Sequence, residues 1–171
     1  RCSSACTCRA RNTAASGQAT ALRAAPSCLN QGMVAAQAER LVRDYSPTLG
    51  PAAAPVTIVE FLDPECEACR AVHPIVKQVM KDFDGRVRLV VRYMPFHQNS
   101  ALAASLLEAA RVHGRFWETL DTFFLRQPEW ASHHAPRPEL LYEYAVLVGL
   151  DAARWKEEAG NAEAPRRRRA P

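Results

Sequence analysis

A pair of cysteines, Cys66 and Cys69, lies between a β-type run and a helical pattern. The run Val56–Leu62 is β-branched and aromatic, with apolar residues on both faces, as in a buried parallel strand. Asp63 and Pro64 end this run, and from Cys66 onward the apolar residues lie on one side of a helix. These apolar positions are Val72, Ile75, Val76, Val79, Met80 and Phe83. The order strand, C-x-x-C, helix predicts an α/β fold.

A second strand is expected after the turn signal Asp84-Gly85, because every second residue from Val87 to Tyr93 is apolar and the residues between them are Arg88, Val90 and Arg92. Together the two strands and the helix make a βαβ unit. The remainder reads as helical, at about 99–113, 115–126, 138–149 and 151–159, the last beginning with Asp151 as N-cap. A short leading helix is expected from Gln31 to Tyr45.

The chain of 171 residues predicts one domain, at residues 31–160. Residues 1–30 lack periodicity and large apolar groups, so we expect a disordered tail there, with no intact secretory signal. Residues 161–171 are expected to form a disordered basic tail. No apolar stretch reaches the roughly 18 to 20 residues that span a bilayer.

The formal net charge of +4 comes from the two ends of the chain. Eight arginines lie in acid-free segments, and without them 14 basic and 18 acidic residues remain. A nucleic-acid-binding function therefore has no electrostatic basis in the body of the chain. The run Arg166–Arg169 is interpreted as a solvated tail.

The spacing of Cys66 and Cys69 suits dithiol chemistry. A helix N-terminus offers unpaired N–H groups and a positive dipole end, which stabilise a thiolate at Cys66. Cys69 lies one turn along, where it can attack a mixed disulfide on Cys66 and release the partner. The pair is therefore predicted to exchange two electrons, with Cys66 as nucleophile and Cys69 as resolving thiol.

The stretch from Val56 to Arg70, followed by 87–96 and 114–118, resembles DsbA-like proteins of the thioredoxin fold with a helical insertion. Glu60 matches their buried acid, which helps Cys69 lose and regain its proton, and Pro74 matches the proline in their active-site helix. The resemblance covers about residues 38–155. It implies a protein thiol:disulfide oxidoreductase without a cofactor, acting on protein thiols and disulfides with an unidentified redox partner, in a periplasmic setting.

The residues around the cysteines are acidic, with Glu67-Ala68 between them and Glu65 just before. Two carboxylates beside a thiolate oppose its formation. We therefore predict a milder oxidant than DsbA, the strongly oxidising example of this chemistry.

The resemblance also predicts a second half, in which a cis-proline loop, two antiparallel strands and a helix complete the sheet. No such pattern follows Leu150, so the C-terminal ββα part is expected to be missing and the fold truncated. Met94-Pro95 directly follows a strand and is interpreted as the start of the helical insertion. A sheet edge and apolar helix faces should then be exposed. Both ends resemble out-of-frame translation of GC-rich DNA, which suggests a disrupted gene.

Two alternatives from other classes remain open. One is a copper or zinc metallochaperone that uses Cys66, Cys69 and His73, and the other is a redox-inactive remnant. A structural zinc site is disfavoured because no second C-x-x-C exists. We assign no function to the other cysteines, which are Cys2, Cys6, Cys8 and Cys28. We interpret His97, His133 and His134 as loop residues without visible partners. The large apolar residues at helical spacing in the inserted helices are expected to be core: Phe116, Trp117, Leu120, Phe123 and Phe124.

Overall fold

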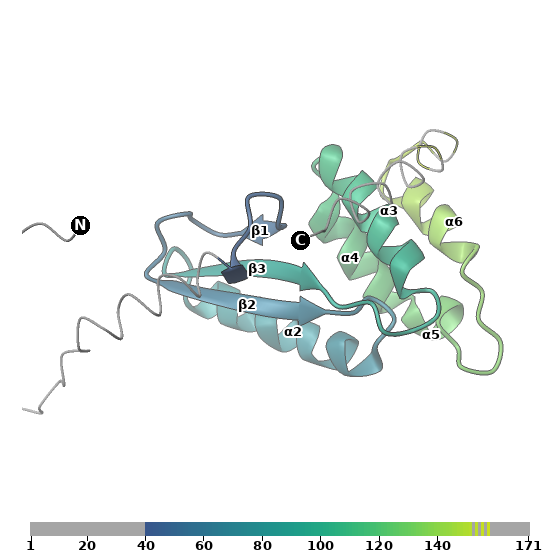
Figure 1. The fold of residues 1–171 in the computed structure, drawn as a ribbon, viewed down its shortest axis with the longest axis horizontal. Coiled ribbons are helices and arrows are strands. Elements are labelled where there is room, and N and C mark those ends of the chain that lie inside the picture. Colours follow the sequence, from purple (N-terminus) through teal and green to yellow (C-terminus); the bar gives the residue numbers. More distant parts are fainter. Residues whose placement is uncertain (1–39, 152, 154, 156, 158–171) are drawn as a thin grey trace, which may run out of the picture.

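The computed structural model describes residues 40–151, 153, 155 and 157. Its sheet holds β1 (Thr48–Leu49), β2 (Val56–Leu62) and β3 (Val87–Tyr93) in the order β1-β3-β2. The helices are α2 (Glu67–Asp82), α3 (Ser100–Val112), α4 (Phe116–Leu125), α5 (Gln127–Trp130) and α6 (Leu140–Leu147). Helix α2 covers one face of the sheet, and α3 to α6 gather beyond the carboxyl ends of β2 and β3 (Figure 1).

The predicted βαβ unit is confirmed. Strands β2 and β3 have the predicted bounds and pair in parallel, from Val56 opposite Val87 to Leu62 opposite Tyr93. Strand β1, which the sequence did not predict, lies antiparallel to β3. Gly50 ends β1 with φ +92°, and a Cβ there would lie 2.6 Å from the Val87 carbonyl oxygen. Only glycine fits this close approach without strain.

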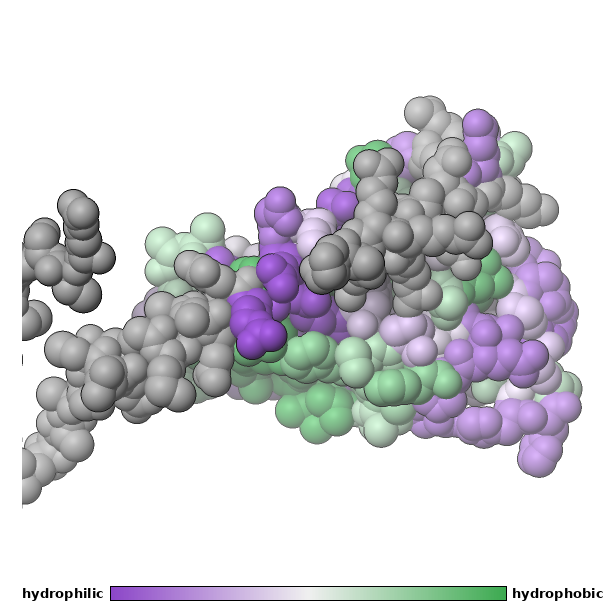
Figure 2. Space-filling view, viewed as in Figure 1, coloured by the Kyte–Doolittle hydropathy of each residue, from purple (hydrophilic) through white to green (hydrophobic). Residues whose placement is uncertain are grey.

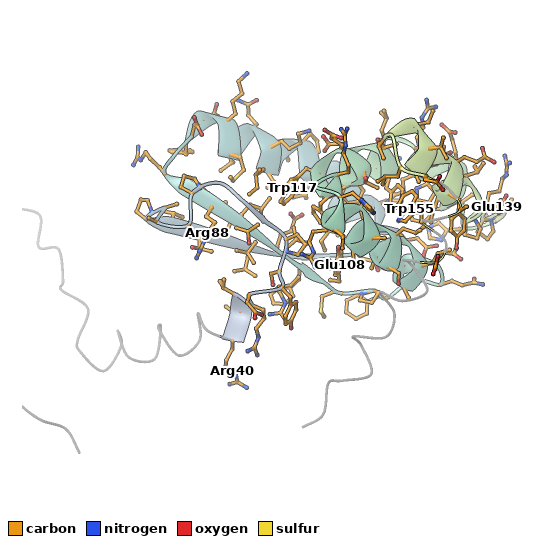
Figure 3. The ribbon with its side chains drawn as sticks, turned by 90° about the horizontal axis from the view of Figure 1, so that it is seen from above. Arg40, Arg88, Glu108, Trp117, Glu139 and Trp155 are labelled. Atoms are coloured by element: carbon orange, nitrogen blue, oxygen red, sulfur yellow. The ribbon has the colours of Figure 1, made fainter. Side chains whose placement is uncertain are left out.

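The largest buried side chains join the sheet to the helices. They include Leu62, Val91, Leu106, Leu120, Phe123, Trp130, Leu141 and Trp155. Trp155 lies among the helices in Figure 3, stacks on Phe123 and donates its indole N–H to the Leu106 carbonyl at 3.1 Å. Glu108, also labelled there, accepts a hydrogen bond from the Tyr93 hydroxyl at 3.0 Å and ties α3 to β3. The predicted core of the inserted helices is confirmed for Phe116, Leu120, Phe123 and Phe124, whereas Trp117 is partly buried at its margin.

The expected exposure of apolar surface is also seen. Strand β2 has no neighbour on its outer edge within the described part of the chain, and its Phe61 is 50% exposed. The apolar positions of α2 are only partly covered, and Ile75 is 61% exposed. Figure 2 shows apolar residues gathered over β2 and along the lower margin of the molecule.

The predicted helices at 99–113, 115–126 and 138–149 are confirmed as α3, α4 and α6, each a few residues shorter than predicted. Residues 153, 155 and 157 are helical, and the Asp151 carboxylate accepts from the Ala153 N–H at 2.9 Å, as expected of an N-cap. The predicted continuation of the leading helix to Tyr45 is wrong, because the described helix has ended after Leu41. The remainder of that helix, both predicted tails, the four N-terminal cysteines and the arginine run lie outside the described residues. Across the residues described, no helix is long and apolar enough to cross a membrane.

Candidate active site

Both cysteines lie at the junction between β2 and α2. The chain leaves β2 at Leu62, makes a turn over Asp63–Cys66, and enters α2 at Glu67, with Cys66 as the N-cap. We call Asp63–Cys66 the redox turn. The Cys66 N–H donates to the Asp63 carbonyl at 3.1 Å, and the Cys66 carbonyl accepts the first helical hydrogen bond, from Arg70. The sulfur of Cys66 thus stands at the positive end of the helix dipole, as the sequence predicted.

Cys69 differs from Cys66 in its surroundings. Both are free and half-buried, but Cys69 packs against the core. Burial raises the pKa of the Cys69 thiol to about 11, with further contributions from a hydrogen bond with Cys66 and from the charge of Glu60. Cys69 therefore keeps its proton at neutral pH and needs a nearby base before it can attack.

Glu60 is a carboxyl whose charge acts on the Cys69 thiol. It lies on β2, half-buried, and its Oε2 is inaccessible to solvent without a hydrogen-bond partner among the described residues. Burial raises the pKa of its carboxyl, although the charge of His73 acts in the opposite direction. The structure thus brings Glu60 into the electrostatic neighbourhood of Cys69.

Sequence reasoning missed Asp63, which was interpreted only as the end of a strand. Its side chain is 4% exposed, and its carboxylate accepts from the Glu65 N–H, the Phe96 N–H, the Ser100 hydroxyl, and both the N–H and the Nδ1 of His97. Although burial would raise the pKa of Asp63, these hydrogen bonds hold it below its ordinary value. The carboxylate therefore fastens the loop after β3 to the redox turn.

Glu65 does not stand free beside the Cys66 thiolate, as the sequence interpretation assumed. It is buried, and its carboxylate accepts from the Asn99 N–H at 2.6 Å, the Asn99 side-chain amide at 3.0 Å and the Ser100 hydroxyl at 3.2 Å. It therefore satisfies donors at the N-terminus of α3, where negative charge is favourable. The Asn-Ser pair opening a helix was the one sequence signal that pointed to such a contact.

Two of the histidines interpreted as loop residues without partners do have them. The Nδ1 of His97 lies 2.8 Å from the Asp63 carboxylate, and this hydrogen bond raises the pKa of His97. The Nε2 of His133 lies 2.6 Å from Glu67. The pKa of Glu67 is lowered by its own backbone N–H and then by His133. The prediction of a mild oxidant was based on Glu65 and Glu67, and of these two carboxylates only Glu67 is exposed. The redox potential itself stays a prediction.

His73 is buried on α2 and faces α4. Its Nε2 lies 2.6 Å from Asp121, and its ring packs on Phe124. In the part of the chain that the structure describes, no three His, Cys, Asp or Glu side chains are grouped so as to hold a metal ion. The metallochaperone alternative, which needs His73 beside both cysteines, thus has no support from these residues.

Beside the redox turn, the first turn of α2 and the segment that begins with α5 line an open pocket of about 280 Å³. Its lining includes Glu67, Arg70, Gln127, Ala131 and His133. Gln127, absent from the sequence predictions, donates its side-chain amide to the carbonyls of the redox turn.

Comparison with known proteins agrees with this geometry. The family model described as thioredoxin matches residues 43–164. BdbD from Bacillus subtilis is 30% identical with a TM-score of 0.61, over 68% of this chain and 66% of its own. A thioredoxin-like oxidoreductase from Silicibacter pomeroyi is 29% identical with a TM-score of 0.59, over 72% and 68%. The α-DsbA1 of Wolbachia pipientis, 17% identical with a TM-score of 0.65, shares the fold.

Curated relatives are longer proteins. The Na(+)/H(+) antiporter NhaA 3 of Salinispora tropica is 37% identical over 117 residues, which are 67% of this chain and 17% of that protein. NhaA of Herminiimonas arsenicoxydans is 38% identical over 106 residues, 62% of this chain and 16% of that protein. The chain thus spans about a sixth of the length of these relatives.

Proposed function

Because the chain belongs to the thioredoxin family and resembles its DsbA-like thiol-disulfide oxidoreductases, we propose that it exchanges disulfides with protein thiols through Cys66 and Cys69. One observation carries the proposal. Cys66 occupies the N-cap of α2, while Cys69, one turn along, has its thiol pKa raised to about 11 by burial, with a contribution from the charge of the half-buried Glu60. The two sulfurs are thereby given different tasks.

In the proposed reaction, a substrate thiolate attacks the Cys66 sulfur of the Cys66–Cys69 disulfide. The S–S bond breaks, Cys69 leaves and takes up a proton, and a mixed disulfide joins Cys66 to the substrate. A second substrate thiolate then attacks the substrate sulfur and releases Cys66. The substrate loses two electrons and two protons, and the cysteine pair gains two electrons.

Glu60 serves in this proposal as the proton relay of Cys69. In the forward direction its carboxyl supplies the proton to the leaving Cys69. In the reverse direction its carboxylate accepts the Cys69 proton, so that Cys69 can attack the mixed disulfide. A carboxyl with a raised pKa suits both steps, because it exchanges its proton nearer to neutral pH than an exposed one.

DsbA-like relatives are typically extracytoplasmic, and we infer a periplasmic or comparable oxidising setting for this domain. Its partners would be protein thiols and disulfides, with a second redox protein that restores the cysteine pair. The function requires no cofactor.

The test is equilibration of the full chain in glutathione buffers of graded potential, followed by acid quench, alkylation and mass spectrometry of the peptide that holds Cys66 and Cys69. The control is a short peptide with the sequence of residues 65–70. We expect a sharp two-electron transition displaced from that of the peptide. Coincident transitions would show that the fold does not poise the pair, and the proposal would fail.

A further inference from the structure

Gln127 connects the helical insertion to the redox turn. It is the first residue of α5, and its side chain is 1% exposed. Its Nε2 donates to the Pro64 carbonyl at 3.0 Å and to the Cys66 carbonyl at 3.1 Å. These acceptors precede Gln127 by 63 and 61 residues, so the contact joins distant parts of the chain.

The orientation of the Gln127 amide is fixed by its partners. A reversed amide would place its oxygen against two carbonyl oxygens, which repel it. In the observed orientation the Oε1 is buried and has no hydrogen-bond partner in the described part of the chain. A buried acceptor without a partner is unfavourable. The side chain thus leaves its own acceptor unsatisfied while it supplies two donors to the turn.

The two polar sides of the redox turn are held by different residues. Asp63 accepts from the N–H groups of Glu65 and Cys66, using its carboxylate and its carbonyl. Gln127 donates to the carbonyls of Pro64 and Cys66. The peptide groups on both sides of the reactive sulfur are therefore hydrogen-bonded.

We propose that Gln127 is a positioning residue, which holds the redox turn in the geometry in which Cys66 reacts and offsets the negative carbonyl oxygens next to its sulfur. The inference rests on the proposed function. It assigns to the helical insertion a direct part in setting the reactivity of Cys66, beyond its contribution to the core.

The physical reason lies in the charge around the thiolate. The carbonyl oxygens of Pro64 and Cys66 carry partial negative charge within two residues of the sulfur. A donor on these oxygens weakens their repulsion of a thiolate, and it also restricts movement of the turn. Loss of the donor therefore disfavours the thiolate and slows its reaction with electrophiles.

The principal variant is Gln127→Met, which keeps the length of the side chain and removes both polar groups. A second variant, Gln127→Glu, keeps the shape and places a carboxylate against the two carbonyls. The matched control is Trp130→Phe. Trp130 lies in the same short helix as Gln127, and the substitution removes the hydrogen bond from its indole to the Phe123 carbonyl without touching the redox turn. Urea denaturation shows that each variant is folded.

The readout is the pH profile of Cys66 alkylation in the reduced full chain, followed by mass spectrometry of the peptide that contains Cys66. Gln127→Met removes both donors, but the Cys66 carbonyl keeps the Arg70 N–H, so the net effect on the thiolate is taken as that of one hydrogen bond. At about 0.5–1.5 kcal/mol this predicts a roughly two- to tenfold fall in rate near neutral pH. Gln127→Glu should fall further, and Trp130→Phe should match the wild type.

Equal profiles in Gln127→Met and the wild type would overturn the inference. So would equal slowing in Gln127→Met and Trp130→Phe, because general loosening of α5 would then suffice. The glutathione titration of the wild type separates this question from the proposed function. A wild-type transition that coincides with the peptide's would reject the function, whereas the alkylation profiles would still report on Gln127.

Discussion

Asp63→Asn is the substitution that most directly probes the polar contacts of the redox turn. It exchanges one carboxylate oxygen for an NH2 group at nearly constant volume. The two oxygens serve different donors, Oδ1 the Glu65 N–H and the Ser100 hydroxyl, and Oδ2 the Phe96 N–H and His97. The amide must therefore turn its NH2 group toward one of these two sets.

The loss of folding stability in Asp63→Asn is set by the less unfavourable of the two amide orientations. In that orientation the NH2 group faces Glu65 and Ser100. The Ser100 hydroxyl can then accept from the amide and still donate to Glu65, whose Oε2 lies 3.2 Å away. The Glu65 N–H, however, loses its acceptor in a buried site. One such donor costs about 1–3 kcal/mol, and replacement of charge-assisted by neutral hydrogen bonds adds about 1 kcal/mol. We expect a loss of about 2–4 kcal/mol in the free energy of unfolding.

Urea denaturation followed by tryptophan fluorescence measures this loss, with an unchanged slope expected if only stability is altered. The matched control is Asp121→Asn. That carboxylate is 41% exposed and pairs with His73 and Lys77, so we expect its replacement to cost less than about 1 kcal/mol. The reasoning is refuted if Asp63→Asn costs no more than Asp121→Asn.

Three further outcomes are expected. Glu60→Gln should slow the attack of Cys69 on a labelled mixed disulfide by roughly tenfold or more, and an unchanged rate in stopped flow would contradict the relay. The hydrogen bond to Asp63 raises the pKa of His97. The stability that this hydrogen bond gives is fully present below the pKa of the unfolded state, 6.5, and is lost as pH rises through the pKa of the folded state. The difference in unfolding free energy between the wild type and His97→Ala should therefore shrink from about pH 5.5 to about pH 8.5, and a constant difference would rule out this linkage. The exposed apolar surface of α2 is expected to make the chain self-associate. Ile75→Lys should then reduce that association in sedimentation velocity at unchanged stability, and equal association would exclude this face as the contact.

Local sequence pattern was sufficient for the βαβ unit. The apolar run of β2 and the alternation in β3 predicted both strands with their bounds, since burial on one or two faces imposes a period that can be read directly. The position of Cys66 followed from the same pattern, because a helix must begin soon after Pro64. For Glu60, the resemblance to DsbA-like proteins supplied the predicted role as a proton relay, and the strand pattern supplied its position on β2.

Contacts across long stretches of sequence escaped prediction. Apart from Glu65, the partners of the Asp63 carboxylate lie 33 to 37 residues later, and Gln127 reaches back 61 and 63 residues, so no local pattern reveals these contacts. The error at Tyr45 has a similar origin. Its spacing fits a helix, but the Arg92 guanidinium donates to the Leu41 carbonyl where that helix ends, and lies 5.9 Å from the Tyr45 ring centroid.

The distance in sequence between Gln127 and the redox turn has a consequence for synthesis of the chain. Cys66 and Cys69 leave the ribosome about 60 residues before the side chain that donates to the Pro64 and Cys66 carbonyls. At about 5–20 residues per second this interval lasts roughly 3–12 s. During that time the Pro64 carbonyl lacks its donor, and the Cys66 carbonyl has only the helical N–H of Arg70. The nascent chain therefore carries the two thiols before the hydrogen bonds from Gln127 exist.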